Sequence, residues 1–119
     1  MKDIEYLKNS NIDIDKGLEL LGDIDTYNDI LEEFYNNIKD RLNKLEKYKN
    51  DGDMENYSIE VHAMKSDSKY LGFSKLAELA LNHQTKSEEN DIDYINGNYE
   101  ALITEANKII DIVKEYLGK

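Results

Sequence analysis

One histidine of the sequence, His62, stands on a predicted helix with two lysines on its flank. At about 100° per residue, His62 lies roughly 130° from the centre of the apolar stripe of that helix, so its ring should face solvent. Lys65 and Lys69 follow one and two turns later on the same flank. A neutral imidazole is a nucleophile, and nearby ammonium groups offset the negative charge of a phosphoryl group. The spacing therefore predicts a surface histidine that can handle a phosphoryl group.

The second histidine, His83, falls inside the apolar stripe of the following predicted helix, with Leu76, Leu79 and Ala80. That position predicts a partly buried imidazole with a hydrogen-bond partner, and not a second phosphorylation site. A metal site that combined His62 with His83 would lack ligand spacing and carboxylate support, so we expect no metal.

Other groupings of reactive residues point to no catalytic chemistry. Adjacent carboxylates, as in Glu32-Glu33 and Glu88-Glu89, project about 100° apart on a helix and do not converge on a substrate. The sequence has no Gly-rich phosphate loop, so we expect no ATP site on this chain. It has no Cys, which excludes a disulfide framework, a thiolate zinc site and a cysteine nucleophile.

The charge of the chain is strongly negative, with 26 acidic and 15 basic residues among 119 and a formal net charge of −11. This balance argues against a nucleic-acid binder, because neutralising phosphates requires a basic face. Residues 61–75 differ, since they hold three lysines against Asp67 alone. Extending the window back to residue 58 adds Glu60 and reduces this local excess of positive charge.

The apolar pattern predicts an all-α single domain over residues 1–119, and the absence of Pro leaves its helices uninterrupted. A short helix is expected at 15–21, followed by long helices at about 26–50, 53–71, from 74 onward, and at about 91–117. Short polar breaks between long amphipathic helices favour antiparallel neighbours, and hence an up-down four-helix bundle over about 26–117 with a short extra N-terminal helix. Gly97 lies inside the last helix and leaves a bend or a late start there open.

No apolar run approaches the roughly 18 residues of a membrane span. The N-terminal residues are too polar for a signal peptide. We therefore expect a cytoplasmic protein that does not bind membranes.

The residues from His62 to Gly72 resemble the signature of histidine-containing phosphotransfer (HPt) domains. That signature has His, an apolar residue two positions on, Lys at plus three, small residues at plus four to six, and then Leu-Gly. The matching positions are His62, Met64, Lys65, Ser66, Ser68, Leu71 and Gly72. Ser66 stands where Gly is commoner, and Asp67 replaces a usual small residue. The resemblance extends over about residues 15–117.

The resemblance implies a monomeric four-helix bundle whose His62 accepts a phosphoryl group from a receiver-domain aspartate and passes it to another. Lys65 would stabilise the phosphorylated ring. Gln84 falls at the spacing of a Glu or Gln that, in some members, hydrogen-bonds the histidine and orients it. The partners implied are a response-regulator receiver domain and a hybrid sensor histidine kinase. The chain would be a phosphoryl carrier and not an enzyme, without a cofactor of its own, since Mg²⁺ belongs to the receiver.

Docking is expected to use small and apolar residues around His62 with a polar rim. The candidates are Ala63, Ser66, Lys69, Tyr70 and Phe73. An alternative function is a non-catalytic helical adaptor that binds a partner helix in a groove. A third is the N-terminal phosphotransfer domain of a chemotaxis-type kinase. A histidine-kinase dimerisation helix is disfavoured, because such helices usually follow their histidine with an acidic residue, whereas Ala63 follows His62.

Overall fold

The computed structural model describes residues 1–119 and consists of helices, with no strand. The helices are α1 (Glu5–Asn9), α2 (Ile14–Leu21), α3 (Ile24–Asp51), α4 (Met54–Leu71), α5 (Ser74–Glu88) and α6 (Ile92–Leu117). The all-α class is therefore confirmed. Each of the five predicted helices begins within two residues of its expected start.

Aspartates and glycines define most of the helix ends. The caps of α2, α3, α4 and α6 are Asp13, Asp23, Asp53 and Asp91, each accepting a hydrogen bond from a backbone N–H in the first turn. Left-handed glycines terminate α3, α4 and α6, namely Gly52, Gly72 and Gly118. The helix α6 begins before Gly97 and continues through it, so no late start occurs there.

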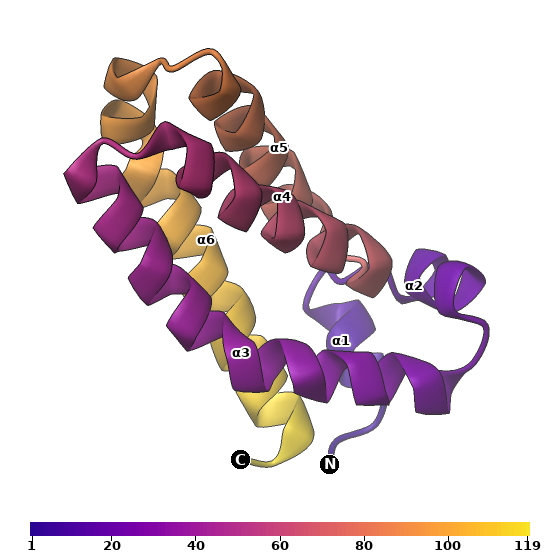
Figure 1. Ribbon diagram of the computed structural model, residues 1–119. Coiled ribbons are helices and arrows are strands. Elements are labelled where there is room, and N and C mark those ends of the chain that lie inside the picture. The colour runs from indigo at the N-terminus through magenta and orange to yellow at the C-terminus, as the bar shows by residue number, and fades with distance from the viewer.

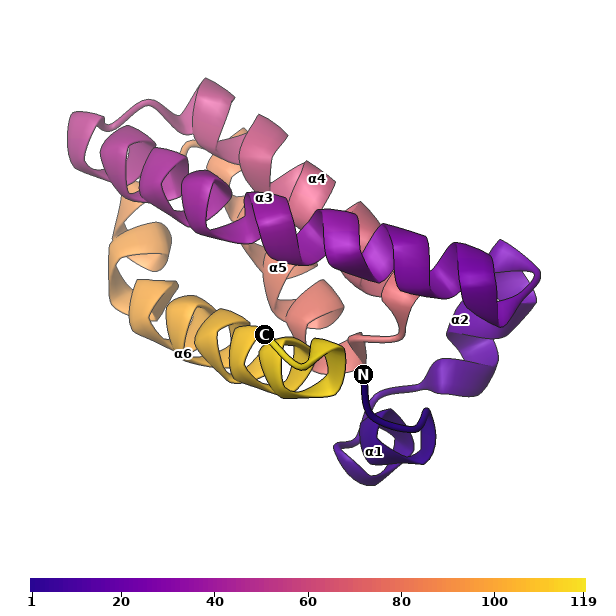
Figure 2. The same cartoon turned by 90° about the horizontal axis from the view of Figure 1, so that it is seen from below.

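The four long helices pack in chain order, each against the next, and α6 also packs against α3. In Figure 1, α4 and α5 run side by side, with α6 extending away from the turn that follows α5. Figure 2 shows α1 and α2 at the same end of the molecule, with the two termini close together. The backbone agrees, because the Lys2 amide donates to the Tyr116 carbonyl at 2.7 Å.

The apolar stripes of the helices meet in one hydrophobic core of 23 buried residues. The largest side chains that are fully enclosed include Tyr27, Tyr57, Tyr116 and Phe73. Burying a side chain of this class contributes on the order of 1.5–3 kcal/mol, so packing and not helix propensity holds the long helices together. None of the helices combines the length and apolar character that crossing a membrane requires.

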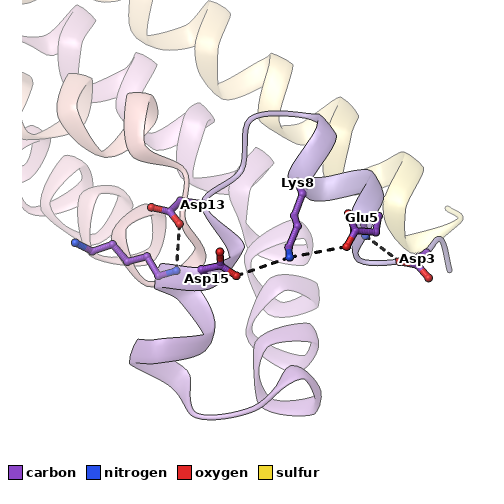
Figure 3. Close-up of polar contacts among 6 residues, drawn as sticks. Asp3, Glu5, Lys8, Asp13 and Asp15 are labelled. Atoms are coloured by element: carbon purple, nitrogen blue, oxygen red, sulfur yellow. Dashed lines mark hydrogen bonds and ion pairs between the residues drawn. The ribbon is translucent and has the colours of Figure 1, made fainter.

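The short helix α1 was not predicted from the sequence. It has five residues, lacks a capping side chain and buries only Leu7, so it carries no periodic pattern to detect. Lys8 lies 3.8 Å from both Glu5 and Asp15, which links α1 to the start of α2 (Figure 3). Exposed ion pairs of this kind contribute little, roughly 0–1 kcal/mol each. Tertiary contacts therefore position α1.

Gly72 ends α4, and it also allows the backbone segment that precedes α2 to pack closely against it. Its φ of +83° is left-handed, as expected for a helix stop. Its carbonyl accepts a 2.9 Å hydrogen bond from the Asp13 amide, and a Cβ at Gly72 would overlap the Asp13 carbonyl. Tyr27 donates its hydroxyl to the Leu71 carbonyl at 2.7 Å. The sequence predicted the stop, but not this contact, which anchors the end of the helix that carries His62.

Candidate functional site

His62 lies on the exposed face of α4, while Val61 and Met64 beside it in sequence are fully buried. The core thus holds the helix through its opposite face and leaves the imidazole accessible. The helical wheel predicted this orientation correctly.

Gln84 on α5 contacts the ring of His62. Its Oε1 lies 3.2 Å from His62 Nδ1, and its Nε2 donates to Glu88 Oε1 at 2.8 Å. Because a carbonyl oxygen only accepts, the contact with Oε1 requires a hydrogen on Nδ1. No hydrogen-bond partner contacts Nε2 of His62, so this nitrogen carries the free lone pair.

A shallow depression of about 240 Å³ adjoins the ring of His62. Its lining comes from α4 and α5, namely Ser58, Ile59, His62, Gln84 and Glu88. Ser58 is small and Ile59 is 59% exposed, so nothing covers the imidazole from this side.

Comparison with protein families gives a direct match. The Hpt domain family model matches residues 29–111, which is more than two thirds of the chain. The matched segment includes His62 and its contact Gln84. The chain belongs to the Hpt domain family. Searches of curated proteins and of solved structures found no match. Hpt domains are phosphocarriers, so membership places this chain in a phosphorelay.

The motif lysine Lys65 and its neighbour on the same flank, Lys69, have no partners within the domain. Lys65 is half-buried and Lys69 is exposed, and neither forms an ion pair or a side-chain hydrogen bond. Lys75, by contrast, lies 3.6 Å from the buried carboxylate of Glu105. The ammonium group of Lys65, one turn from His62, is therefore free to interact with an incoming anion.

Asp67, the acidic departure from the Hpt motif, lines a different side of α4. It shares a cavity of about 320 Å³ with residues of α3, including Glu33 and Arg41, and none of these lines the depression at His62. Burial raises the pKa of Asp67, and the nearby Arg41 guanidinium counteracts this. The extra carboxylate is accommodated against α3, so its charge does not lie beside the exposed imidazole.

Four of the five docking candidates remain at the surface of the Hpt domain. Ala63 and Ser66 are half-buried, whereas Lys69 and Tyr70 are exposed. Phe73 is wrong as a docking residue, because it is only 1% exposed and packs edge-to-face on Phe34 with ring centroids 5.2 Å apart. The turn at Gly72 directs the following side chain into the core.

Two exposed apolar residues near the site were not predicted from the sequence. Ile59 is 59% exposed and precedes His62 by one turn, and Leu81 is 46% exposed and precedes Gln84 by nearly one turn on α5. Both lie outside the apolar stripes of their helices. In the sequence, a large aliphatic residue outside the apolar stripe of its helix could have indicated this surface. Exposed aliphatic residues of this kind are suited to contact with a partner.

His83 is 1% exposed, so it is more buried than the partly buried position predicted. Its Nε2 lies 3.1 Å from the Asn98 carbonyl oxygen, and its Nδ1 lies 2.8 Å from the Tyr57 hydroxyl. Nε2 must donate to the carbonyl, and in the neutral ring Nδ1 then accepts from the Tyr57 hydroxyl. Burial lowers the pKa of His83. The prediction of a hydrogen-bonded core histidine is confirmed.

Proposed function

We propose that this Hpt domain carries a phosphoryl group on Nε2 of His62 and exchanges it with the aspartates of receiver domains. The observation that carries the proposal is the contact of Nδ1 with Gln84, which leaves Nε2 exposed with a free lone pair. In this proposal Gln84 acts as the orienting residue that the resemblance to HPt domains implied.

In the proposed step, Nε2 attacks the phosphorus of the receiver's phospho-aspartate in line with the bond that breaks. An N–P bond forms, the P–O bond to the aspartate breaks, and the carboxylate leaves with the electron pair. Nδ1 keeps its proton, so the phosphorylated ring becomes an imidazolium whose positive charge the Gln84 oxygen stabilises. Transfer to a second receiver is the reverse step.

Lys65 supports this step electrostatically. Its unpaired ammonium group offsets the charge of the phosphoryl oxygens as the group moves to His62. The chain needs no cofactor in this scheme, because Mg²⁺ would be held by the receiver. The partners are then a response-regulator receiver domain and a hybrid sensor histidine kinase.

We further propose that the four long helices form an up-down antiparallel bundle and that residues 1–119 act as one cytoplasmic monomeric domain. Two observations support the bundle. Each of the four helices packs against the next in chain order, and the last, α6, packs against the first, α3. The connections between the helices are short. Short connections favour antiparallel neighbours.

The test is transfer from a charged receiver. Receiver domains phosphorylated with acetyl phosphate are mixed with the wild-type chain, His62→Gln and His83→Gln, and acid-labile, base-stable phosphate is measured on each. We expect phosphate on the wild type and on folded His83→Gln, and none on His62→Gln. No transfer from a panel of receivers would instead favour the helical adaptor.

A further inference from the structure

Three side chains from two helices form a continuous hydrogen-bonded chain that ends on a carboxylate. His62 on α4 contacts Gln84 on α5 at 3.2 Å, and Gln84 contacts Glu88, one turn further along α5, at 2.8 Å. Glu88 forms no ion pair, unlike its neighbour Glu89, which lies 3.6 Å from Lys86. The polar contact of the Glu88 side chain within the domain is therefore with Gln84.

The direction of this chain follows from what each group can donate. A glutamine side chain has a donor end and an acceptor end, and either end could face an imidazole nitrogen. An ionised carboxylate only accepts, so Glu88 selects the NH₂ end of Gln84. The amide oxygen must then face His62, where it requires a hydrogen on Nδ1. The charge on Glu88 thereby determines which ring nitrogen of His62 has the lone pair.

We propose that Glu88 is a positioning residue for phosphotransfer, which acts through Gln84 to hold His62 as the Nδ1–H tautomer with Nε2 as the nucleophile. This inference rests on the proposed function of His62. Glu88 does not touch the reacting atoms, because the amide of Gln84 lies between it and the ring. Its negative charge also polarises the chain in the direction that favours positive charge on the ring during attack.

A merely structural Gln84–Glu88 contact would behave differently. Such a pair at i and i+4 on an exposed helix face stabilises the helix slightly and has no effect on a ring in another helix. The tautomer of His62 distinguishes the two roles, since only positioning requires it to depend on Glu88. Without the carboxylate, the amide can turn its NH₂ end toward Nδ1, which favours the Nε2–H tautomer and removes the nucleophilic lone pair from Nε2.

The experiment compares wild type, Glu88→Ala, Glu88→Gln and the control Glu78→Ala, where Glu78 is an exposed residue of α5 without a side-chain partner. Two-bond ¹H–¹⁵N correlation spectra report which nitrogen of His62 is protonated. They are recorded on the unphosphorylated proteins at a pH at which the imidazole is neutral. We expect Nδ1–H in the wild type and Glu78→Ala, and a shift toward Nε2–H in Glu88→Ala. Glu88→Gln retains an acceptor and should fall between them.

Transfer rates from a charged receiver provide the second measurement. We expect Glu88→Ala to be about 3- to 10-fold slower, in proportion to the lost fraction of the competent tautomer, with Glu78→Ala unchanged. If His62 keeps the wild-type tautomer in Glu88→Ala, the positioning role is overturned, even if the variant is less stable than the wild type. If the wild type accepts no phosphate although Glu88 controls the tautomer, the proposed function fails, the role of Glu88 in phosphotransfer fails with it, and only its control of the His62 tautomer stands.

Discussion

The two histidines of this domain show how one side chain type acquires two roles. His62 and His83 lie on the adjacent helices α4 and α5, and each ring uses Nδ1 for a hydrogen bond. At His83 the second nitrogen also has a partner, the Asn98 carbonyl, and the ring is buried. At His62 the second nitrogen has none, and the ring is exposed. The structural histidine, His83, has hydrogen-bond partners for both ring nitrogens, whereas the reactive histidine, His62, has a partner for only one.

The largest expected effect is on stability, when the buried histidine, His83, is replaced. His83→Leu leaves the Tyr57 hydroxyl and the Asn98 carbonyl unpaired in the core, so it should destabilise the domain by about 2–4 kcal/mol. His62→Leu removes no buried bond and should change stability by less than about 0.5 kcal/mol. Urea unfolding followed by circular dichroism measures both. Equal destabilisation by the two substitutions would contradict the assignment of roles.

Lys65→Ala should affect only the exposed histidine. We expect transfer to slow about 10-fold, equivalent to about 1.4 kcal/mol of barrier, because an unpaired cation beside the moving phosphoryl group is lost. The unfolding midpoint should remain that of the wild type. Single-turnover transfer measures the rate, and Lys108→Ala provides the matched control, because Lys108 is an exposed lysine of α6 without an ion pair. Unchanged transfer in Lys65→Ala would remove this residue from the site.

Acid should destabilise the domain through His83. Burial lowers its folded pKa below the ordinary 6.5, so the unfolded state binds this proton first as the pH falls. The stabilisation is complete well above 6.5 and is lost progressively as the pH falls through 6.5 toward the lower folded pKa, with a slope of at most about 1.4 kcal/mol per pH unit.

Urea midpoints of the wild type and His83→Leu at one pH above 6.5 and one below it isolate this contribution. The titrations of the carboxylates are common to both proteins, so the difference reports His83. An identical pH dependence in the two proteins would show that His83 is not the responsible group.

The smallest effect concerns a buried polar group that, unlike His83, has no partner. The hydroxyl oxygen of Ser68 is enclosed without a hydrogen bond. Ser68→Ala removes an unsatisfied group and little volume, so we expect unchanged stability or a gain of up to about 1 kcal/mol. Thermal unfolding tests this, with Ser58→Ala at the exposed site as the control. A clear loss of stability would indicate a hydrogen-bond partner for Ser68 that the fold does not show.

Apolar periodicity predicted the helices of this fold and the exposure of His62 from the sequence. Apolar stripes and the short polar breaks between them placed the long helices, and the wheel of α4 separated the exposed His62 from the buried Val61. The burial of Phe73 was missed because its direction depends on the turn at Gly72 and on Phe34 of another helix. The link from Gln84 to Glu88 was missed because Glu88 was considered only with its sequence neighbour, not with the residue one turn earlier.

The central claim is that Nε2 of His62 is the phosphoryl-accepting atom, and its position can be measured directly. Phosphorus NMR of the ¹⁵N-labelled domain, charged by a phosphorylated receiver, identifies the nitrogen bonded to phosphorus through its coupling. We expect one phosphorylated nitrogen, Nε2 of His62, and no such signal in His62→Gln. Phosphorus on Nδ1 of His62, or on His83, would contradict the claim.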